Sequence, residues 1–323
     1  MLLIRHLALA LTIATYTATG LATPQGSEPT LGVSLYNQLK ISSAISELEK
    51  EAQSGNVESQ YYLGEALRKR NRYMTSEAQH WYETAANNGS IYAMIQLGRS
   101  SRDLCQQMKN CPLGEKSPAD WFEKAKGLAL QKTNEGDPES LYLMYEITLN
   151  RDWLEKSAMA GYPIAQYWMA VSERQGEGFF FIPGKRDASV KKWLLLSSEG
   201  GNPKAMMDYL QILYEEGDMS SVRHWLEVAA ETGDQTATSN YGAYISHTPD
   251  SVGYPLDLVK GYALFSLLKE LEDAGGIKDY VDRKIEKISE KMTPEQIEQA
   301  EGVAKEWKKI HPPLSFFPDK LGR

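Results

Sequence analysis

The chain has 323 residues, of which 42% are hydrophobic, and this is enough for a large buried core. Its formal net charge is -8 at pH 7. The acidic balance argues against nucleic acid and anionic membrane as partners, because both surfaces are themselves negatively charged.

Residues 1–22 have the features of a secretory signal peptide. Arg5 precedes an apolar stretch that is too short to span a bilayer, and small residues lead to a plausible cleavage site after Ala22. No later stretch approaches the roughly 18 apolar residues that a membrane helix needs. We therefore expect an exported protein with no integral membrane segment after signal removal, periplasmic if the source is a Gram-negative bacterium. Residues 23–40 would form an N-terminal lead-in.

A spacing of tryptophan, glycine and a small residue recurs in residues 41–275. The glycine lies eight positions after the tryptophan, and the small residue lies four positions after the glycine. The complete copies are Trp81, Gly89 and Ala93; Trp153, Gly161 and Ala165; Trp193, Gly201 and Ala205; and Trp225, Gly233 and Ala237. Two copies without the tryptophan are Gly55 with Ser59 and Gly136 with Ser140. Periods of this length are typical of helical solenoids, in which stacked units build one continuous core.

Each copy predicts two antiparallel helices joined by a short turn. A glycine just past a helix accepts a left-handed backbone conformation, and a polar residue then caps the next helix. The predicted caps are Asn56, Ser90, Asp137, Asn202 and Asp234, and the prolines at the first helical position are Pro138, Pro163 and Pro203. A second small position should let helices approach closely, at Gly64, Gly98, Ala170 and Gly242. We expect an all-α fold, a right-handed α-solenoid with a C-terminal capping helix, in which the four repeat tryptophans belong to the core.

Two stretches depart from this pattern. The insertion RDLCQQMKNCPLGEKSP contains Cys105 and Cys111, which either form a local disulfide in an oxidising compartment or remain two structural thiols. The connector QGEGFFFIPGKRD contains Phe179, Phe180 and Phe181, which either plug against the solenoid or form an exposed anchor for a partner.

Residues 276–323 are expected to form capping helices and an extended tail. Thr293, Pro294 and Gln296 make a good helix start with a capping box. Pro312 and Pro313 prevent a helix in the tail, KIHPPLSFFPDKLGR. The aromatic residues of the tail, Phe316 and Phe317, either cover the open end of the core or dock to a partner.

The repeats resemble a known family. AQSGNVESQYYLG, AANNGSIYAMIQLG and AMAGYPIAQYWMA resemble Sel1-like repeats, which are related to the tetratricopeptide class. DLVKGYALFSLL resembles the last unit of such arrays, and KMTPEQIEQAEGVAKEW resembles their closing helix. The resemblance extends over about residues 41–308 and implies a binding scaffold, because such arrays are not tied to one activity.

Binding residues follow from helical geometry. The third position after each small residue points away from the core and should line the concave face, where solenoids commonly hold partners. This row comprises Tyr62, Gln96, Trp168, Asp208 and Asn240, and we add Phe179, Phe180 and Phe181 as candidate partner contacts. No recognised catalytic, phosphate-binding or metal-binding motif is present, so we expect no enzyme activity, no cofactor and no metal site.

The function is inferred from resemblance. The chain resembles exported Sel1-like proteins that have degenerate repeats and no enzyme motif. These proteins include immunity partners of type VI secretion lipase effectors, especially phospholipase D-like ones. The resemblance implies a non-enzymatic periplasmic protein that binds such an effector and neutralises it. The alternative is a general cell-envelope scaffold that recruits a cell-wall enzyme or a host protein.

Overall fold

The computed structural model describes residues 29–271 and 276–322, so the predicted signal peptide, residues 1–22, lies outside the described residues. The first half contains α1 (Leu31–Asn37), α2 (Ile41–Gln53), α3 (Val57–Asn71), α4 (Ser76–Asn87), α5 (Ile91–Arg99), α6 (Leu104–Met108), α7 (Pro118–Asn134), α8 (Pro138–Thr148), α9 (Arg151–Met159) and α10 (Pro163–Arg174). The second half contains α11 (Lys185–Glu199), α12 (Pro203–Glu215), α13 (Met219–Glu231), α14 (Gln235–Ile245), α15 (Leu258–Leu268), α16 (Lys278–Ser289) and α17 (Pro294–Ile310). Two short 3-10 helices are η1 (Ser100–Arg102) and η2 (Lys269–Leu271).

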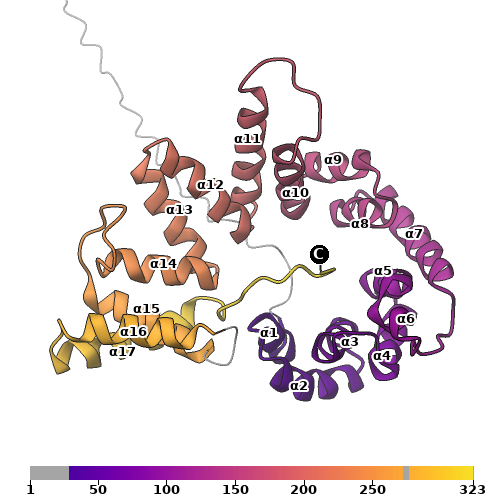
Figure 1. The fold of residues 1–323 in the computed structure, drawn as a ribbon, viewed down its shortest axis with the longest axis horizontal. Coiled ribbons are helices and arrows are strands. Elements are labelled where there is room, and N and C mark those ends of the chain that lie inside the picture. Colours follow the sequence, from indigo (N-terminus) through magenta and orange to yellow (C-terminus); the bar gives the residue numbers. More distant parts are fainter. Residues whose placement is uncertain (1–28, 272–275, 323) are drawn as a thin grey trace, which may run out of the picture.

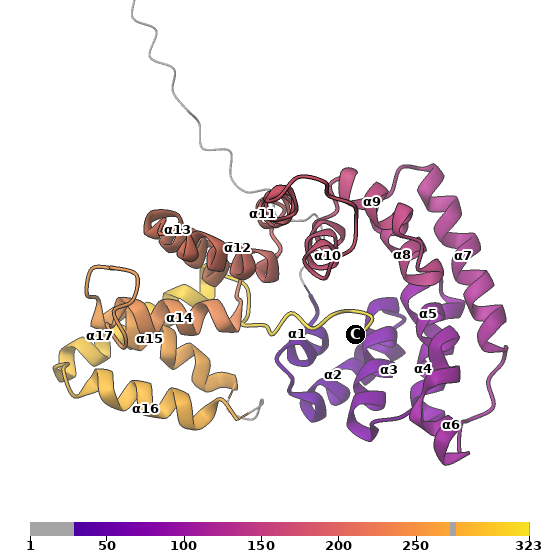
Figure 2. The same cartoon turned by 45° about the horizontal axis from the view of Figure 1, so that its top comes forward.

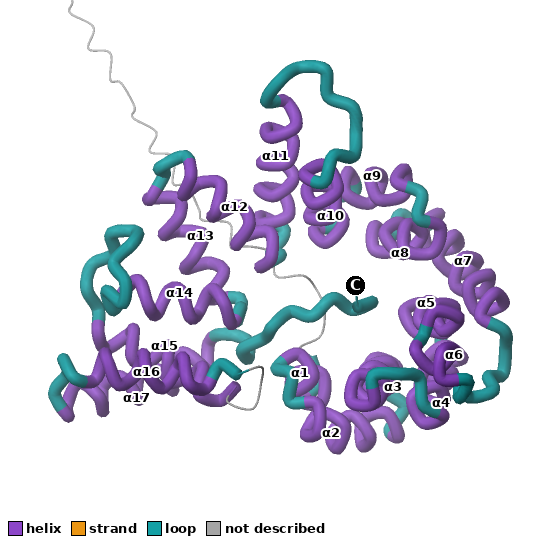
Figure 3. The backbone as a smooth tube through the Cα atoms, in the orientation of Figure 1, coloured by secondary structure: helices purple, strands orange, loops and turns teal. Residues whose placement is uncertain are grey.

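The helices form an all-α solenoid that curves into an open ring (Figure 1). Most helices pack on the helices before and after them in sequence, as in α2 against α3 and α3 against α4. In hairpins such as α4–α5 and α7–α8, the second helix lies nearer the centre of the ring than the first (Figure 1). In the part of the chain that the structure describes, helices and loops account for the whole ribbon and no strand occurs (Figure 3).

The predicted turns are confirmed. All six repeat glycines have a left-handed φ, between 84° and 95°. At Gly89, the glycine N–H donates to Ala86 O at 3.2 Å, and the N–H of Ser90 donates to Ala85 O at 2.9 Å. These two carbonyl groups at the end of α4 therefore have hydrogen-bond donors. The predicted caps accept a backbone N–H through their side chains, and the predicted prolines occupy the first turn.

The small residues also lie where the spacing places them. The six residues that follow each glycine by four positions are at most 1% exposed. A Cβ atom added at Gly64 would lie 2.9 Å from the Tyr82 ring, and one added at Gly98 would lie 2.7 Å from the Phe122 ring. The helices therefore approach too closely at these points for a larger residue.

The expected role of the repeat tryptophans is only partly right. Trp81, Trp153, Trp193 and Trp225 are half-buried and pack against the margins of the core. The core beside them is filled by residues such as Tyr82, Ala85 and Leu154. Trp121 of α7, which lies outside the repeated spacing, is the tryptophan that is fully buried among the described residues.

The insertion is held by a polar anchor and a disulfide. Cys105 and Cys111 are bonded, with Cα atoms 4.7 Å apart. Asp103 accepts hydrogen bonds from Met74 N at 2.8 Å, Cys105 N at 3.1 Å and Arg68 Nε at 2.9 Å. Burial alone would raise the pKa of Asp103, but these hydrogen bonds and the Arg68 charge hold it below its usual value.

The C-terminal tail, residues 311–322, is extended and crosses the inside of the ring (Figures 1 and 3). Ser315 pairs with the turn before α14: Gln235 N donates to Ser315 O at 3.0 Å, and Ser315 N donates to Gly233 O at 2.8 Å. Phe316 packs against the C-terminal core cluster, which fits a covering role for this ring. The tail then continues to the N-terminal half, a path that was not predicted, and Leu321 joins the core cluster of that half.

Candidate protein-binding surface

The connector between α10 and α11, residues 175–184, projects from the ring as an aromatic loop (Figure 1). Phe179 and Phe181 are 80% and 84% exposed, and their ring centroids lie 4.4 Å apart in an edge-to-face arrangement. Ile182 beside them is also exposed. The alternative of a plug against the solenoid is wrong for these two phenylalanines, because the loop carries them outward.

The base of the aromatic loop is fixed by two arginines. Arg186 donates to the carbonyl oxygens of Glu173 and Glu177, each at 2.6 Å, and its guanidinium lies 4.8 Å from the Phe180 ring. Phe180 is therefore half-buried against Arg186. Arg151 forms ion pairs with Glu173 at 3.6 Å and with Glu177 at 3.7 Å. The exposed apolar tip thus stands on a base with many polar contacts.

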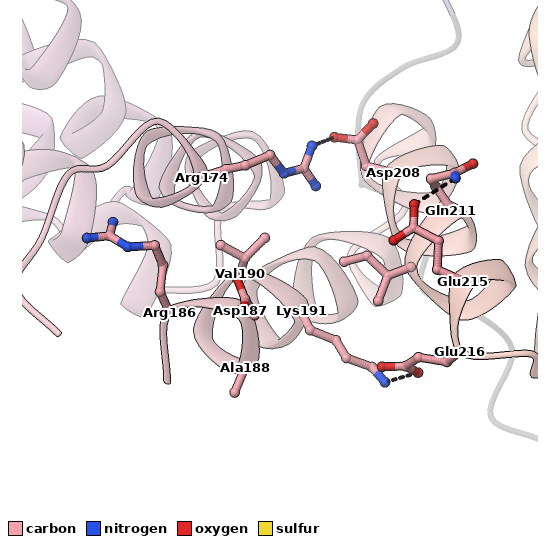
Figure 4. Close-up of a pocket in the computed structure, with 11 residues that line it drawn as sticks. Arg174, Arg186, Asp187, Ala188, Val190, Lys191, Asp208, Gln211, Glu215 and Glu216 are labelled. Atoms are coloured by element: carbon pink, nitrogen blue, oxygen red, sulfur yellow. Dashed lines mark hydrogen bonds and ion pairs between the residues drawn. The ribbon is translucent and has the colours of Figure 1, made fainter. Parts of the chain in front are cut away.

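A cavity of about 640 Å³, lined by both charged and apolar side chains, lies between α10, α11 and α12 (Figure 4). Arg186 is shared between the cavity wall and the aromatic loop. Arg174 pairs with Asp208 across the cavity at 2.9 Å, and Lys191 pairs with Glu216. The predicted contact Asp208 therefore lies in the cavity wall, with its charge matched by Arg174.

The first two residues of the predicted concave row lie under the C-terminal tail. Tyr62 is 8% exposed, between the rings of Tyr36 and Tyr61, at centroid distances of 5.1 Å and 5.3 Å. Gln96 donates to Glu65 Oε1 at 2.5 Å and to Leu321 O at 3.3 Å. Both residues face the tail, since Lys320 also lies over the Tyr62 ring, but both are buried, and Tyr62 belongs to the N-terminal core cluster. Neither residue is available to a partner while the tail is docked.

The remaining members of the row are separate from this region. Trp168 is half-buried on α10, with its ring 5.8 Å from that of Tyr167. Asn240 is half-buried on α14. The row is therefore not one continuous exposed stripe, because the tail divides the inner face.

A buried acid lies beneath the tail. Glu65 of α3 is bonded to Gln96 and lies 3.1 Å from the Tyr61 hydroxyl. Burial raises the pKa of Glu65 above its usual value, although the hydrogen bonds and the Arg68 charge oppose this shift. A carboxyl group in this setting holds neighbouring side chains in place, and no described cluster of three metal-ligating residues accompanies it.

Several residues of this region escaped the sequence reasoning. The Tyr61 hydroxyl donates to the Lys320 carbonyl oxygen. Arg99 donates to Leu321 O at 3.3 Å. These contacts join residues more than 200 positions apart, and no local pattern in the sequence signals them.

The fold and surface define a class of protein, an α-solenoid of helix hairpins with an apolar loop on its rim and a tail in its ring. No protein-family model matches the chain. No curated protein matches it either.

Several solved structures are similar to it, including those of two proteins. One is a protective antigen present in uropathogenic Escherichia coli strains and described as displaying an SLR fold, with 19% identity over 84% of this chain and a TM-score of 0.46. The chain spans 57% of the length of that protein. The other is a Sel1 repeat protein from Oxalobacter formigenes, with 19% identity over 74% of this chain and 98% of that one, and a TM-score of 0.39.

Proposed function

We propose that this chain is a non-enzymatic, protein-binding solenoid that engages its partner through the aromatic loop. The observation that carries the proposal is the exposure of Phe179, Phe181 and Ile182 on a loop whose base is fixed by Arg151 and Arg186. Exposed aromatic clusters mark interaction sites, and aromatic residues dominate interface hot spots. A loop that is already ordered loses little conformational entropy on binding, so more of the burial energy contributes to affinity.

The more specific proposal is an exported immunity protein for a phospholipase D-like effector of type VI secretion. It is supported by the signal-peptide features of residues 1–22 and by the resemblance of the repeats to exported Sel1-like immunity proteins. A lipase that acts on membranes presents an apolar surface around its active-site mouth, and the Phe179 and Phe181 rings fit such a surface. Inhibition would be stoichiometric, by occlusion of that mouth or of the membrane-facing surface.

Co-expression with the lipase of a neighbouring gene tests this proposal. The wild-type chain should co-purify with the lipase and protect cells from it. The double variant F179S/F181S should lose both effects, whereas L113S should keep them, because Leu113 is even more exposed but lies in the insertion. Failure of the wild-type chain to protect would exclude the immunity function. Capture of a cell-wall enzyme instead would favour the envelope-scaffold alternative.

A further inference from the structure

The end of the tail shows how the inner face holds an extended peptide. Lys320 and Leu321 contact a group of residues that we call the tail cleft, formed by Glu58, Tyr61, Tyr62, Tyr92, Gln96 and Arg99 from α3 and α5. Figure 2 also shows the C-terminal end beside these two helices. The tail is therefore a peptide bound in cis.

Much of this recognition is directed at the peptide backbone. Tyr61 donates through its hydroxyl to the Lys320 carbonyl oxygen, and Gln96 and Arg99 each donate to the Leu321 carbonyl oxygen at 3.3 Å. Any extended segment presents the same carbonyl groups. These contacts would accept a peptide from another protein as well as this tail.

Two side-chain contacts add selectivity. The Lys320 ammonium lies 4.5 Å from the centroid of Tyr92 and 6.0 Å from that of Tyr62, and it pairs with Glu58 at 3.3 Å. Aromatic faces and a carboxylate together favour a cation. Leu321 is 5% exposed and packs into the N-terminal core cluster. The cleft thus recognises a lysine followed by an aliphatic residue.

The cleft is held in shape by contacts that do not involve the tail. Gln96 is bonded to Glu65 at 2.5 Å, Arg99 pairs with Glu146 at 2.7 Å, and Tyr92 donates to Glu139 at 2.5 Å. Removal of the tail would leave each of these donors with a partner. A preformed site of this kind can exchange one peptide for another at low cost.

We propose that the tail cleft binds an extended segment of a partner protein in which a lysine precedes an aliphatic residue, and that the chain's own tail fills the cleft in the free protein. The inference deepens the proposed function and rests on it, because it assigns a second contact with a protein partner. The acidic character of the chain and of Glu58 matches the basic residue of the ligand. Partner binding at this site requires release of Lys320 and Leu321.

A labelled synthetic peptide tests the proposal on full-length protein. The peptide SFFPDKLGR, which has the sequence of residues 315–323, is titrated by fluorescence anisotropy against wild type and against K320E/L321D. The variant should release its tail, because a glutamate would face Glu58 and an aspartate would enter the apolar pocket. It should bind the peptide at least about tenfold more tightly than wild type, whose tethered tail competes at an effective concentration on the order of millimolar.

Control measurements separate cleft binding from other adhesion. Adding Tyr92→Ala to K320E/L321D should weaken peptide binding, and a peptide with glutamate and aspartate in place of its lysine and leucine should not bind. If circular dichroism shows that the double variant is unfolded, L321A replaces it, since this change removes only the buried side chain. Absence of saturable binding to a folded variant would overturn the proposal, as would equal binding by wild type and variant.

One further outcome would change the occupant. A stable dimer of wild type in light scattering, with tails exchanged between copies, would overturn the assignment to a partner protein. Failure of the peptide assay would leave the co-purification test of the aromatic loop unaffected, so the two proposals can fail separately.

Discussion

Two glycines at equivalent turns provide a direct measure of how tightly the tail lies on the solenoid. Gly89 and Gly233 both follow the first helix of a hairpin, with φ of 95° and 84°. A Cβ atom added at Gly89 meets no atom within 4 Å, whereas one added at Gly233 lies 2.7 Å from Pro313 O of the tail. Alanine at either site has the same backbone strain, but only at Gly233 does it collide with the tail.

The magnitudes follow from these two terms. The left-handed conformation costs a residue with a Cβ roughly 1–2 kcal/mol, so Gly89→Ala should lower the free energy of unfolding by about that amount. Overpacking against the tail costs about 1–3 kcal/mol more, so Gly233→Ala should lower the free energy of unfolding by that much more than Gly89→Ala does. The chain can relieve the collision by releasing the tail, but it then loses the pairing of Ser315 with Gly233 and Gln235.

Urea denaturation followed by circular dichroism measures both costs, and limited proteolysis reports tail release. Gly233→Ala should have the lower midpoint and a tail that is cleaved faster. Equal midpoints for the two variants, with equal cleavage rates, would refute the packing of the tail against the turn before α14.

Three further predictions concern stability. Gly127 lies exposed in the middle of α7 with no atom within 4 Å of an added Cβ, so Gly127→Ala should raise the free energy of unfolding by about 0.5–1 kcal/mol in the same urea assay. Asp103→Asn should lower it by about 1–3 kcal/mol at pH 7, since it weakens three charge-assisted hydrogen bonds. Because the folded-state pKa of Asp103 is lowered, its contribution is present above the unfolded pKa of about 3.9 and is lost as pH falls through the folded value; a deficit of Asp103→Asn that persists unchanged in acid would contradict this. The folded-state pKa of Glu65 is raised, so the stability of wild type relative to Glu65→Gln should increase as pH falls from 7 towards the unfolded pKa of about 4.3. Thermal melts of both proteins over this range measure the change, and a relative stability that does not change with pH would contradict it.

The hairpins could be predicted because their determinants are local. A glycine that ends one helix, a polar cap and a proline at the start of the next all act within a few residues, and Gly161, Tyr162 and Pro163 show how the turn forms even where the capping residue is not a small polar one. The burial of Ala165 and its equivalents follows from the same spacing.

The binding surfaces were less predictable because they depend on distant residues. Nothing in QGEGFFFIPGKRD distinguishes a plug from an anchor. Part of the support for the loop comes from Arg151, which lies 26 residues before its partner Glu177. Likewise, Tyr62 and Gln96 are covered by Lys320 and Leu321 from the other end of the chain, which helical geometry alone does not predict. The tail has no helical periodicity, so its sequence does not predict which part of the solenoid it packs against.

Hydrogen exchange of the captured complex tests the central claim most directly. If the chain is a solenoid that binds its partner through the aromatic loop, amides of residues 175–184 should exchange more slowly in the complex than in the free protein. Amides of the insertion around Leu113, which is 101% exposed, should be unchanged. Protection of the insertion or the outer helices, with residues 175–184 unaffected, would contradict the account.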